Sequence, residues 1–366
     1  MNCNTNVVMN LTATADKKLH NEGTSKLGPV DIAQLTCFSL IFLFGGIGNI
    51  LVLLVIRNKR KNLSMKINDY FILNLALADL LNIFCSIPVD FYQKFQKFSV
   101  GSLLCNVLWP LMSTGFFASI FTLTCMAIER HRSICRPLKP RLSQRGVILL
   151  LGFVWAAAFV CVLPLVIVAY WDGKTCREGW PNHSMRLGYS LAIVLLQYVV
   201  PLMVIAFAYT SISRVLKKSR FMKSKTTVAQ HGEKQFKGTP RFLHRSRVND
   251  NDRIIKNLRI IVILFAIFIL PKQIVWMWYE FGDGESYSGY RNLLIFSEFF
   301  LYIHSMLNPV VYGTILREYR HGFKKYISKA CPCLLLISSI KVVPATPEMA
   351  EHNKFTQQQG LKLYSC

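Results

Sequence analysis

Long apolar runs recur along the chain and alternate with shorter segments that carry most of its charge. A helix needs about 20 apolar residues to cross the ~30 Å hydrocarbon layer of a membrane. The pattern therefore predicts an all-α membrane protein, a bundle of seven transmembrane helices within residues 31–329, flanked by tails at residues 1–30 and 330–366. The predicted spans cover residues 32–56, 67–91, 102–134, 146–171, 187–216, 253–279 and 291–315.

The segment after the last span predicts a short eighth helix over residues 317–329. Its apolar residues recur at helical spacing on one face: Tyr319, Phe323, Tyr326 and Ile327. Cations lie elsewhere around the axis, which is typical of an amphipathic helix on the inner leaflet in contact with anionic lipid. Palmitoylation at Cys331 or Cys333 would attach its end to the membrane. A solvated tail is the alternative.

The basic residues predict the orientation of the bundle. The net charge is +24 although 52% of residues are hydrophobic, and Lys and Arg concentrate after the first, third, fifth and seventh spans. Basic segments stay in the cytoplasm, so the N-terminus is expected outside and the protein in the plasma membrane. Two glycosylation sequons, at Asn10 and Asn182, then lie outside. This regular alternation disfavours nucleic-acid binding as the reason for the charge.

Of the eleven cysteines, several are expected on the oxidising side of the membrane. Cys105 opens the third span, and Cys176 lies between the fourth and fifth spans. A disulfide between them would hold that loop across the end of the bundle. Cys3 and Cys37 are also expected outside, and whether they pair stays open.

Polar residues inside the spans are the first candidates for function, because a charge within a bilayer is costly. A rise of ~1.5 Å per helical residue places four of them at one level, somewhat below the midplane. These four are Asn49, Asp79, Ser119 and Asn308, with Ser305 one turn above Asn308. We expect a shared pocket that holds water, a sodium ion or a proton; four separately satisfied residues are the alternative. Pro309 interrupts the helix beside this level, where it can bend.

Short motifs occur in the spans in a fixed order. They are Gly48-Asn49, NLALADL at Asn74–Leu80, ERH at Glu129–His131, Trp155, Pro201, Tyr209 and NPVVY at Asn308–Tyr312. Each is weak alone. Together they resemble the rhodopsin-like G-protein-coupled receptors, over roughly residues 30–333.

The resemblance implies a receptor, not an enzyme, that promotes nucleotide exchange on a heterotrimeric G protein. Arrestin and a receptor kinase are further implied partners. Arg130 resembles the arginine that holds the resting state, and Glu129 its neighbouring acid. The remaining implied activation residues are Ile120, Pro201, Tyr209, Phe265, Pro271, Asn308, Pro309 and Tyr312.

Beyond the mild change of Asp-Arg-Tyr to Glu129-Arg130-His131, two positions depart from the family pattern. Ile269 stands where most members have a tryptophan, so Phe265 or Phe268 is expected to act in its place. Asn251 stands where some members have an acid that pairs with the arginine, although Asp250 and Asp252 flank it. A weak lock predicts appreciable ligand-independent signalling.

The ligand class follows partly by exclusion. Monoamine receptors of the family have an aspartate where this chain has Met112, and opsins have a lysine where it has Tyr302. Acidic and aromatic residues at the outer ends instead favour a guanidinium partner, which forms a bidentate pair with a carboxylate. We expect a peptide with a basic residue near an amidated end, as for neuropeptide receptors. The expected ligand contacts are Asp90, Trp109, Met112, Phe116, Gln197, Glu280, Glu298 and Tyr302.

Other interpretations remain at this point. Glu298 can pair internally with Lys272, which would leave no free site for a ligand cation. The receptor can take a non-peptide small molecule, or signal constitutively without an agonist. A transporter is a remote alternative, because the chain has no matched inverted halves. No cofactor is expected apart from an allosteric sodium ion.

Overall fold

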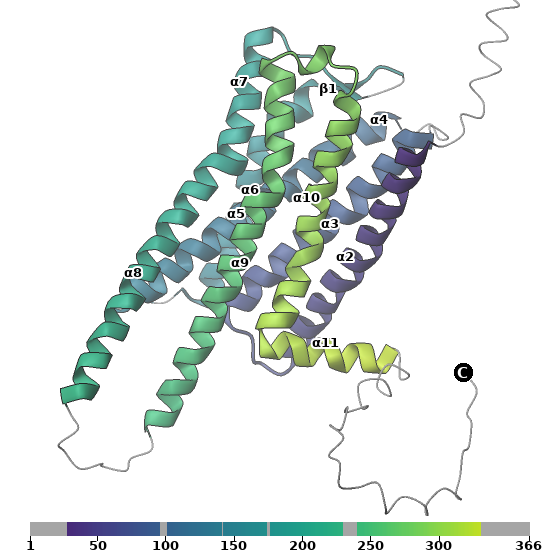
Figure 1. The fold of residues 1–366 in the computed structure, drawn as a ribbon. Coiled ribbons are helices and arrows are strands. Elements are labelled where there is room, and N and C mark those ends of the chain that lie inside the picture. The colour runs from purple at the N-terminus through teal and green to yellow at the C-terminus, as the bar shows by residue number, and fades with distance from the viewer. Residues whose placement is uncertain (1–27, 96–100, 141, 174–175, 230–239, 331–366) are drawn as a thin grey trace, which may run out of the picture. The chain divides into compact units, whose positions relative to one another are not determined.

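The structure is a computed structural model that describes residues 28–95, 101–140, 142–173, 176–229 and 240–330 (Figure 1). Seven of its helical segments are long and apolar enough to cross a membrane, which confirms the predicted helical bundle. The long helices are α2 (Pro29–Lys61), α3 (Ile67–Phe95), α5 (Trp109–Cys135), α6 (Gln144–Val168), α8 (Val200–Ala229), α9 (Pro240–Phe281) and α10 (Tyr290–Ile315). Shorter elements are α4 (Gly101–Leu103), α7 (His183–Val194), the π turns η2 (Leu104–Leu108) and η3 (Leu195–Val199), and the 3₁₀ turn η4 (Gly284–Ser286).

Two of the seven spans are composite helices. The third runs through α4, η2 and α5, and the fifth through α7, η3 and α8. Pro110 and Pro201 lie just after the two π turns. Proline lacks the N–H group of a regular helical hydrogen bond, and π turns are a common local adjustment in a helix. Both irregularities lie in the half of the span that carries candidate ligand residues.

The fourth span ends earlier than predicted. The expected boundary at Trp171 is wrong, because α6 ends at Val168 and Ala169–Trp171 forms strand β1. This strand pairs antiparallel with β2 (Cys176–Glu178), with Trp171 opposite Cys176. A short run of apolar residues is compatible with either a helix or a strand, so hydropathy alone could not place the boundary.

The fifth span begins earlier than predicted. Its helix α7 starts at His183, because the Asn182 side chain caps it by accepting a hydrogen bond from the Met185 N–H group at 2.8 Å. Asparagine is a favoured N-cap residue. Ser143 caps α6 in the same way, accepting from the Gly146 N–H group at 3.1 Å.

Close packing of α2 on α10 places a glycine against the proline of the last span. A Cβ atom added at Gly48 would lie 3.0 Å from the Pro309 Cβ atom. A larger residue would push the two helices apart beside the predicted bend. Large apolar residues such as Leu149, Phe153 and Ile167 on α6 are exposed, as expected of side chains that face lipid.

The predicted eighth helix is present as α11 (Arg317–Ala330). The chain divides into two compact units, one ending at Phe323 and one beginning at Lys324, whose described residues complete this helix. In the first unit Tyr319 is buried, and a Cβ atom at Gly322 would meet the Val55 side chain. Cys331, Cys333, Cys3 and Asn10 lie outside the described residues.

Candidate functional site

The predicted disulfide between Cys105 and Cys176 is present, with 5.3 Å between the Cα atoms. It joins η2, at the start of the third span, to β2. A Cβ atom at Gly101 would overlap the indole ring of Trp171, so the hairpin lies directly on the start of this span. We call this end of the bundle the disulfide end, and the opposite end, where α5 carries Arg130, the Arg130 end.

A bidentate ion pair joins α7 to α9 at the disulfide end. The Arg186 Nε and Nη2 atoms donate to the Glu280 carboxylate at 2.9 and 3.1 Å. The Glu280 side chain is 2% exposed and that of Arg186 is 30% exposed. From the sequence, Glu280 was expected to bind a guanidinium group of the ligand. In the structure a guanidinium group of the chain itself occupies it, because α7 brings Arg186 to the same level.

A second charged group gathers α3, α9 and α10. The Lys272 Nζ atom donates to the Glu298 Oε1 atom at 2.8 Å, so the internal pair considered as an alternative is the one that forms. The Tyr302 hydroxyl donates to the Asp90 Oδ2 atom at 2.7 Å. Asp90 is close enough to Glu298 and Lys272 to interact electrostatically. Asp90, Glu298 and Tyr302 therefore form one cluster, as the expected ligand site requires, but each already has a partner.

The other expected ligand contacts are more dispersed. Gln197 is buried in the π turn η3, and Met112 and Phe116 are half-buried on α5. Trp109 packs against the apolar cluster between α5 and α6 that contains Phe117 and Val162. Trp109 therefore contacts α6. This packing does not support the expected stacking of Trp109 on a ligand.

Most of the polar residues predicted at one level of the bundle are joined by hydrogen bonds near Asp79, but Ser119 is not joined to them in the described chain. The Asn308 Nδ2 atom donates to the Asp79 Oδ2 atom at 2.7 Å, and the Asn49 Nδ2 atom donates to the Ser305 carbonyl at 3.1 Å. Asn49, Asp79 and Asn308 are fully buried. Ser119 is buried on α5, and among the described residues it has no hydrogen bond to this group.

Several oxygen atoms of this polar core lack a protein partner. Within the described part of the chain these are the Oδ1 atoms of Asn49, Asp79 and Asn308 and the Tyr312 hydroxyl. Buried polar atoms are almost always hydrogen-bonded, to protein or to ordered water. A carboxylate with two amide oxygens is a donor set that suits a hard cation such as sodium or a water cluster. The residues therefore fit the sodium ion that the sequence suggested.

The Arg130 guanidinium group contacts two neighbouring side chains. Its Nε atom lies 3.2 Å from the Glu129 Oε2 atom, and its Nη2 atom donates to the Asn68 Oδ1 atom at 3.4 Å. Glu129 thus pairs with Arg130, and α3 contributes a contact that the sequence did not suggest. The side chains of Asn251 and the flanking aspartates are not among those described. Tyr209 is buried on α8.

Aromatic residues connect the middle of the bundle where the expected tryptophan is absent. Ile269 is buried, and the fully buried ring of Phe265 lies 6.0 Å from Tyr198 and 5.9 Å from His304. Phe265 therefore joins η3 to α10, whereas Phe268 contacts Phe300. Ile120 is buried as well.

A polar network that the sequence did not suggest ties α11 to the bundle. Lys59 pairs with Asp69 at 2.8 Å and with Glu318, and the Tyr319 hydroxyl donates to Asp69 at 2.8 Å. Burial raises the pKa of the Glu318 carboxyl, but hydrogen bonds from Lys59 and Lys66 outweigh this and leave the pKa below its ordinary value. The available signal was the isolated Asp69 at the start of an apolar span.

The side-chain amide of Asn257 on α9 is buried without hydrogen bonds in the described part of the chain. It is fully buried, and neither its Oδ1 nor its Nδ2 atom has a hydrogen-bond partner among the described residues. An unsatisfied buried amide costs about 1–3 kcal/mol, and an apolar residue of the same shape removes that cost.

We therefore expect Asn257→Leu to raise the melting temperature of the purified receptor by several degrees. Asn74→Leu is the matched control, because the Asn74 amide donates to Thr122 at 2.7 Å and accepts from Trp155 at 2.8 Å. That change should lower the melting temperature, since it removes two made hydrogen bonds. Thermal unfolding of both variants, followed in detergent, checks the opposite signs; equal losses would contradict the argument.

Comparison with known proteins identifies the family. The model of the family "7 transmembrane receptor (rhodopsin family)" matches residues 48–312. Galanin receptor 2b of Danio rerio is 27% identical, over 83% of this chain and 77% of its own length. Neuropeptide receptor npr-1 of Caenorhabditis elegans is 27% identical, over 78% of this chain and 70% of its own length. Neuropeptide FF receptor 2 of Mus musculus is 28% identical, over 79% of this chain and 71% of its own length. The chain therefore belongs to the rhodopsin family of seven-transmembrane receptors, which are multi-pass membrane proteins and not enzymes.

Proposed function

We propose that this receptor binds an extracellular neuropeptide at the disulfide end and promotes nucleotide exchange on a heterotrimeric G protein at the Arg130 end. The observation that carries the proposal is the similarity to galanin, neuropeptide FF and npr-1 receptors along most of their length. Met112 and Tyr302, in the places of the monoamine aspartate and the opsin lysine, support it by disfavouring two other ligand classes.

The paired carboxylates change how a basic peptide would bind. A ligand guanidinium group would replace Arg186 on Glu280 or Lys272 on Glu298, since both acids already have a cation. Such an exchange keeps a cation on the buried carboxylate throughout, although the ligand must compete with the cation that is already there. It also releases α7 from α9, or α9 from α10, so that binding energy is coupled to helix movement.

Helix α10 would carry the change toward the other end. It contains Glu298 and Tyr302 in the candidate ligand site, then Ser305 and Asn308 in the polar core, then Tyr312. Pro309 lies inside this helix. A shift at its outer half therefore alters the Asn308–Asp79 contact, and a ligand that prefers the shifted state changes the population.

Other features follow from the same proposal. A sodium ion at Asp79 would stabilise one state, and the N-terminus would face outward from the plasma membrane. A glycan at Asn182 would attach to the amide nitrogen, while the Oδ1 atom still caps α7. We also propose that α11 contacts the membrane and that Cys331 or Cys333 is palmitoylated. Arrestin and a receptor kinase are further proposed partners of the active receptor.

Nucleotide exchange in membranes from expressing cells tests the proposal. We expect at least one amidated basic neuropeptide of a panel to raise exchange, and Arg130→Ala to reduce that response at least tenfold with peptide binding retained. A response confined to amine or lipid agonists, with none to any peptide, would contradict the peptide assignment. An unchanged response in Arg130→Ala would contradict the role of the Arg130 end.

A further inference from the structure

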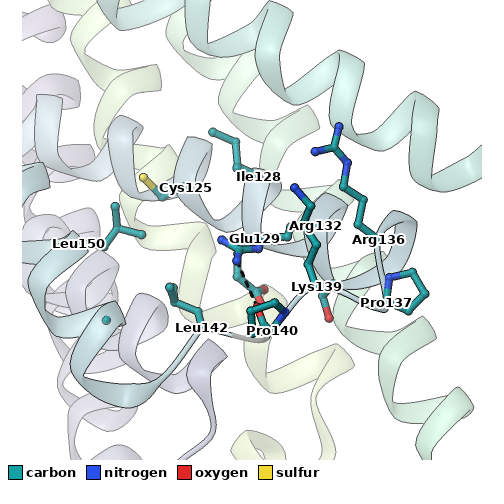
Figure 2. A pocket seen from close by; sticks show the side chains of 12 residues that line it. Cys125, Ile128, Glu129, Arg132, Arg136, Pro137, Lys139, Pro140, Leu142 and Leu150 are labelled. Carbon is teal, nitrogen blue, oxygen red and sulfur yellow. Dashed lines mark hydrogen bonds between the residues drawn. The ribbon is translucent and has the colours of Figure 1, made fainter.

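A cavity opens beside the Arg130 end, on the outside of the bundle core. It has a volume of about 460 Å³ and lies between the end of α5, the described residues 136–140 and 142–143 of the connection, and the start of α6. None of the residues placed in the candidate ligand site or the polar core lines it. Its walls differ in character from one side to the other (Figure 2).

One side of the cavity is apolar. Cys125, Ile128, Leu142 and Leu150 line it, and Figure 2 shows Cys125, Leu142 and Leu150 grouped together. By the ~1.5 Å rise per residue, Cys125 lies about 15 Å from the end of α5, and Leu150 about 9 Å from the start of α6. Both distances from the helix ends exceed the thickness of the polar interface of a bilayer, which is about 5–8 Å on each side.

The other side is cationic. Arg132, Arg136 and Lys139 line it, all three are exposed, and no acid of the described residues forms an ion pair with them. Arg132 donates to the Pro140 carbonyl at 3.1 Å, which leaves its other donors available. Glu129 is the acid of the lining, but its carboxylate lies against Arg130. The cations therefore outweigh it.

From this arrangement we propose that the cavity binds an anionic glycerophospholipid of the cytoplasmic leaflet. The phosphate and headgroup contact Arg136, Lys139 and the available donors of Arg132. The first part of an acyl chain follows Ile128 and Leu142 toward Leu150. Charge complementarity and depth both favour this occupant, because a lipid has its anion at the interface and its chain in the hydrocarbon layer. The inference needs no knowledge of the ligand or the G protein.

Lipid binding to the purified full-length receptor tests the proposal. Native mass spectrometry would compare dioleoyl phosphatidylserine with dioleoyl phosphatidylcholine for the wild type and for Arg136→Gln/Lys139→Gln. We expect selective phosphatidylserine binding, and a Kd about thirtyfold higher in the double variant, from the usual contribution of two cations near a membrane surface. Both side chains are exposed, so the variant should fold, and its melting temperature verifies this.

The matched control removes two cations at the same end but outside the cavity. Arg145→Gln/Lys256→Gln has the same change in net charge, and both residues are exposed. It should bind phosphatidylserine as the wild type does. An equal loss in both double variants would overturn the proposal in favour of general surface attraction, and equal binding of the two lipids would overturn the role of the cations.

The apolar side needs its own test. Leu150→Trp should fill the apolar side of the cavity and weaken phosphatidylserine binding at least fivefold. Leu149→Trp is the control, because Leu149 is exposed on the lipid-facing side of α6 and does not line the cavity. Glycerophosphoserine, which has no acyl chains, should not compete at equal concentration. Full competition by this soluble headgroup would show an anion site without a lipid, and would overturn the proposal.

Discussion

Arg186→Ala is expected to destabilise the purified receptor more than Glu280→Gln does. The Glu280 side chain is almost fully buried, so loss of Arg186 leaves a carboxylate without its cation. Removal of one partner of a buried ion pair costs about 3–5 kcal/mol, and the partial exposure of Arg186 places the loss near the lower value. We expect the melting temperature to fall by about 6–10 °C for Arg186→Ala.

Glu280→Gln should cost less, because Arg186 is about a third exposed and can remain hydrated. The double variant Arg186→Ala/Glu280→Gln completes a cycle, and the two losses should not add, since the second change removes the stranded charge. Thermal unfolding in detergent measures all four proteins. Additive losses, or a greater loss for Glu280→Gln, would show that the pair does not act as one unit.

The same variants separate two ways of binding a peptide. If the ligand cation takes the place of Arg186, Arg186→Ala raises the affinity for a basic peptide, because the competitor is gone. If the peptide binds elsewhere, the affinity changes little.

Asp79→Asn is expected to reduce agonist-stimulated nucleotide exchange at least tenfold while the protein still reaches the cell surface. The substitution keeps the size of the side chain but removes the charge that accepts from the Asn308 amide at 2.7 Å. A hydrogen bond to a charged group contributes about 1.5–3 kcal/mol, so its loss changes the ratio of two states by roughly tenfold or more. The site lies at Pro309, where α10 is expected to bend.

Sodium provides an independent measurement at this site. In the wild type, agonist affinity should fall as sodium replaces an equal concentration of a large organic cation. Asp79→Asn should remove that dependence. Asp69→Asn is the control, because Asp69 is a buried carboxylate that accepts from the Tyr319 hydroxyl and lies outside both the polar core and the candidate ligand site. Sodium dependence that survives in Asp79→Asn would rule out the cation site.

Much of the architecture was predictable, because a bilayer imposes a strong constraint on sequence. Runs of about 20 apolar residues must be helices there, since unpaired backbone groups are costly in lipid. Asp79 and Asn308 were also predictable as neighbours, since helical rise converts residue number into depth. The end of the fourth span was not, because Ala169–Trp171 becomes a strand only through pairing with Cys176–Glu178.

The partners of charged side chains were harder to predict. Arg186 and Glu280 are 94 residues apart, and Tyr319 and Asp69 are 250 apart. Nothing local links them, and each acid had several cations within reach of a plausible bundle. An internal pair of Lys272 and Glu298 was considered only as the alternative, and the sequence favoured a Glu298 that is free for the ligand, whereas the structure pairs the two.

Residue type and spacing were enough to establish the seven helices, the depth of the buried acid and the family motifs, because these depend on the membrane and on helical geometry. Rotation of each helix about its axis depends on packing. It directs Glu280 toward Arg186, Trp109 toward α6, and the cations of α5 and its following loop around a shared cavity. The hydropathy of a segment does not specify how its helix is rotated about its axis. These pairings are therefore visible only in the tertiary structure.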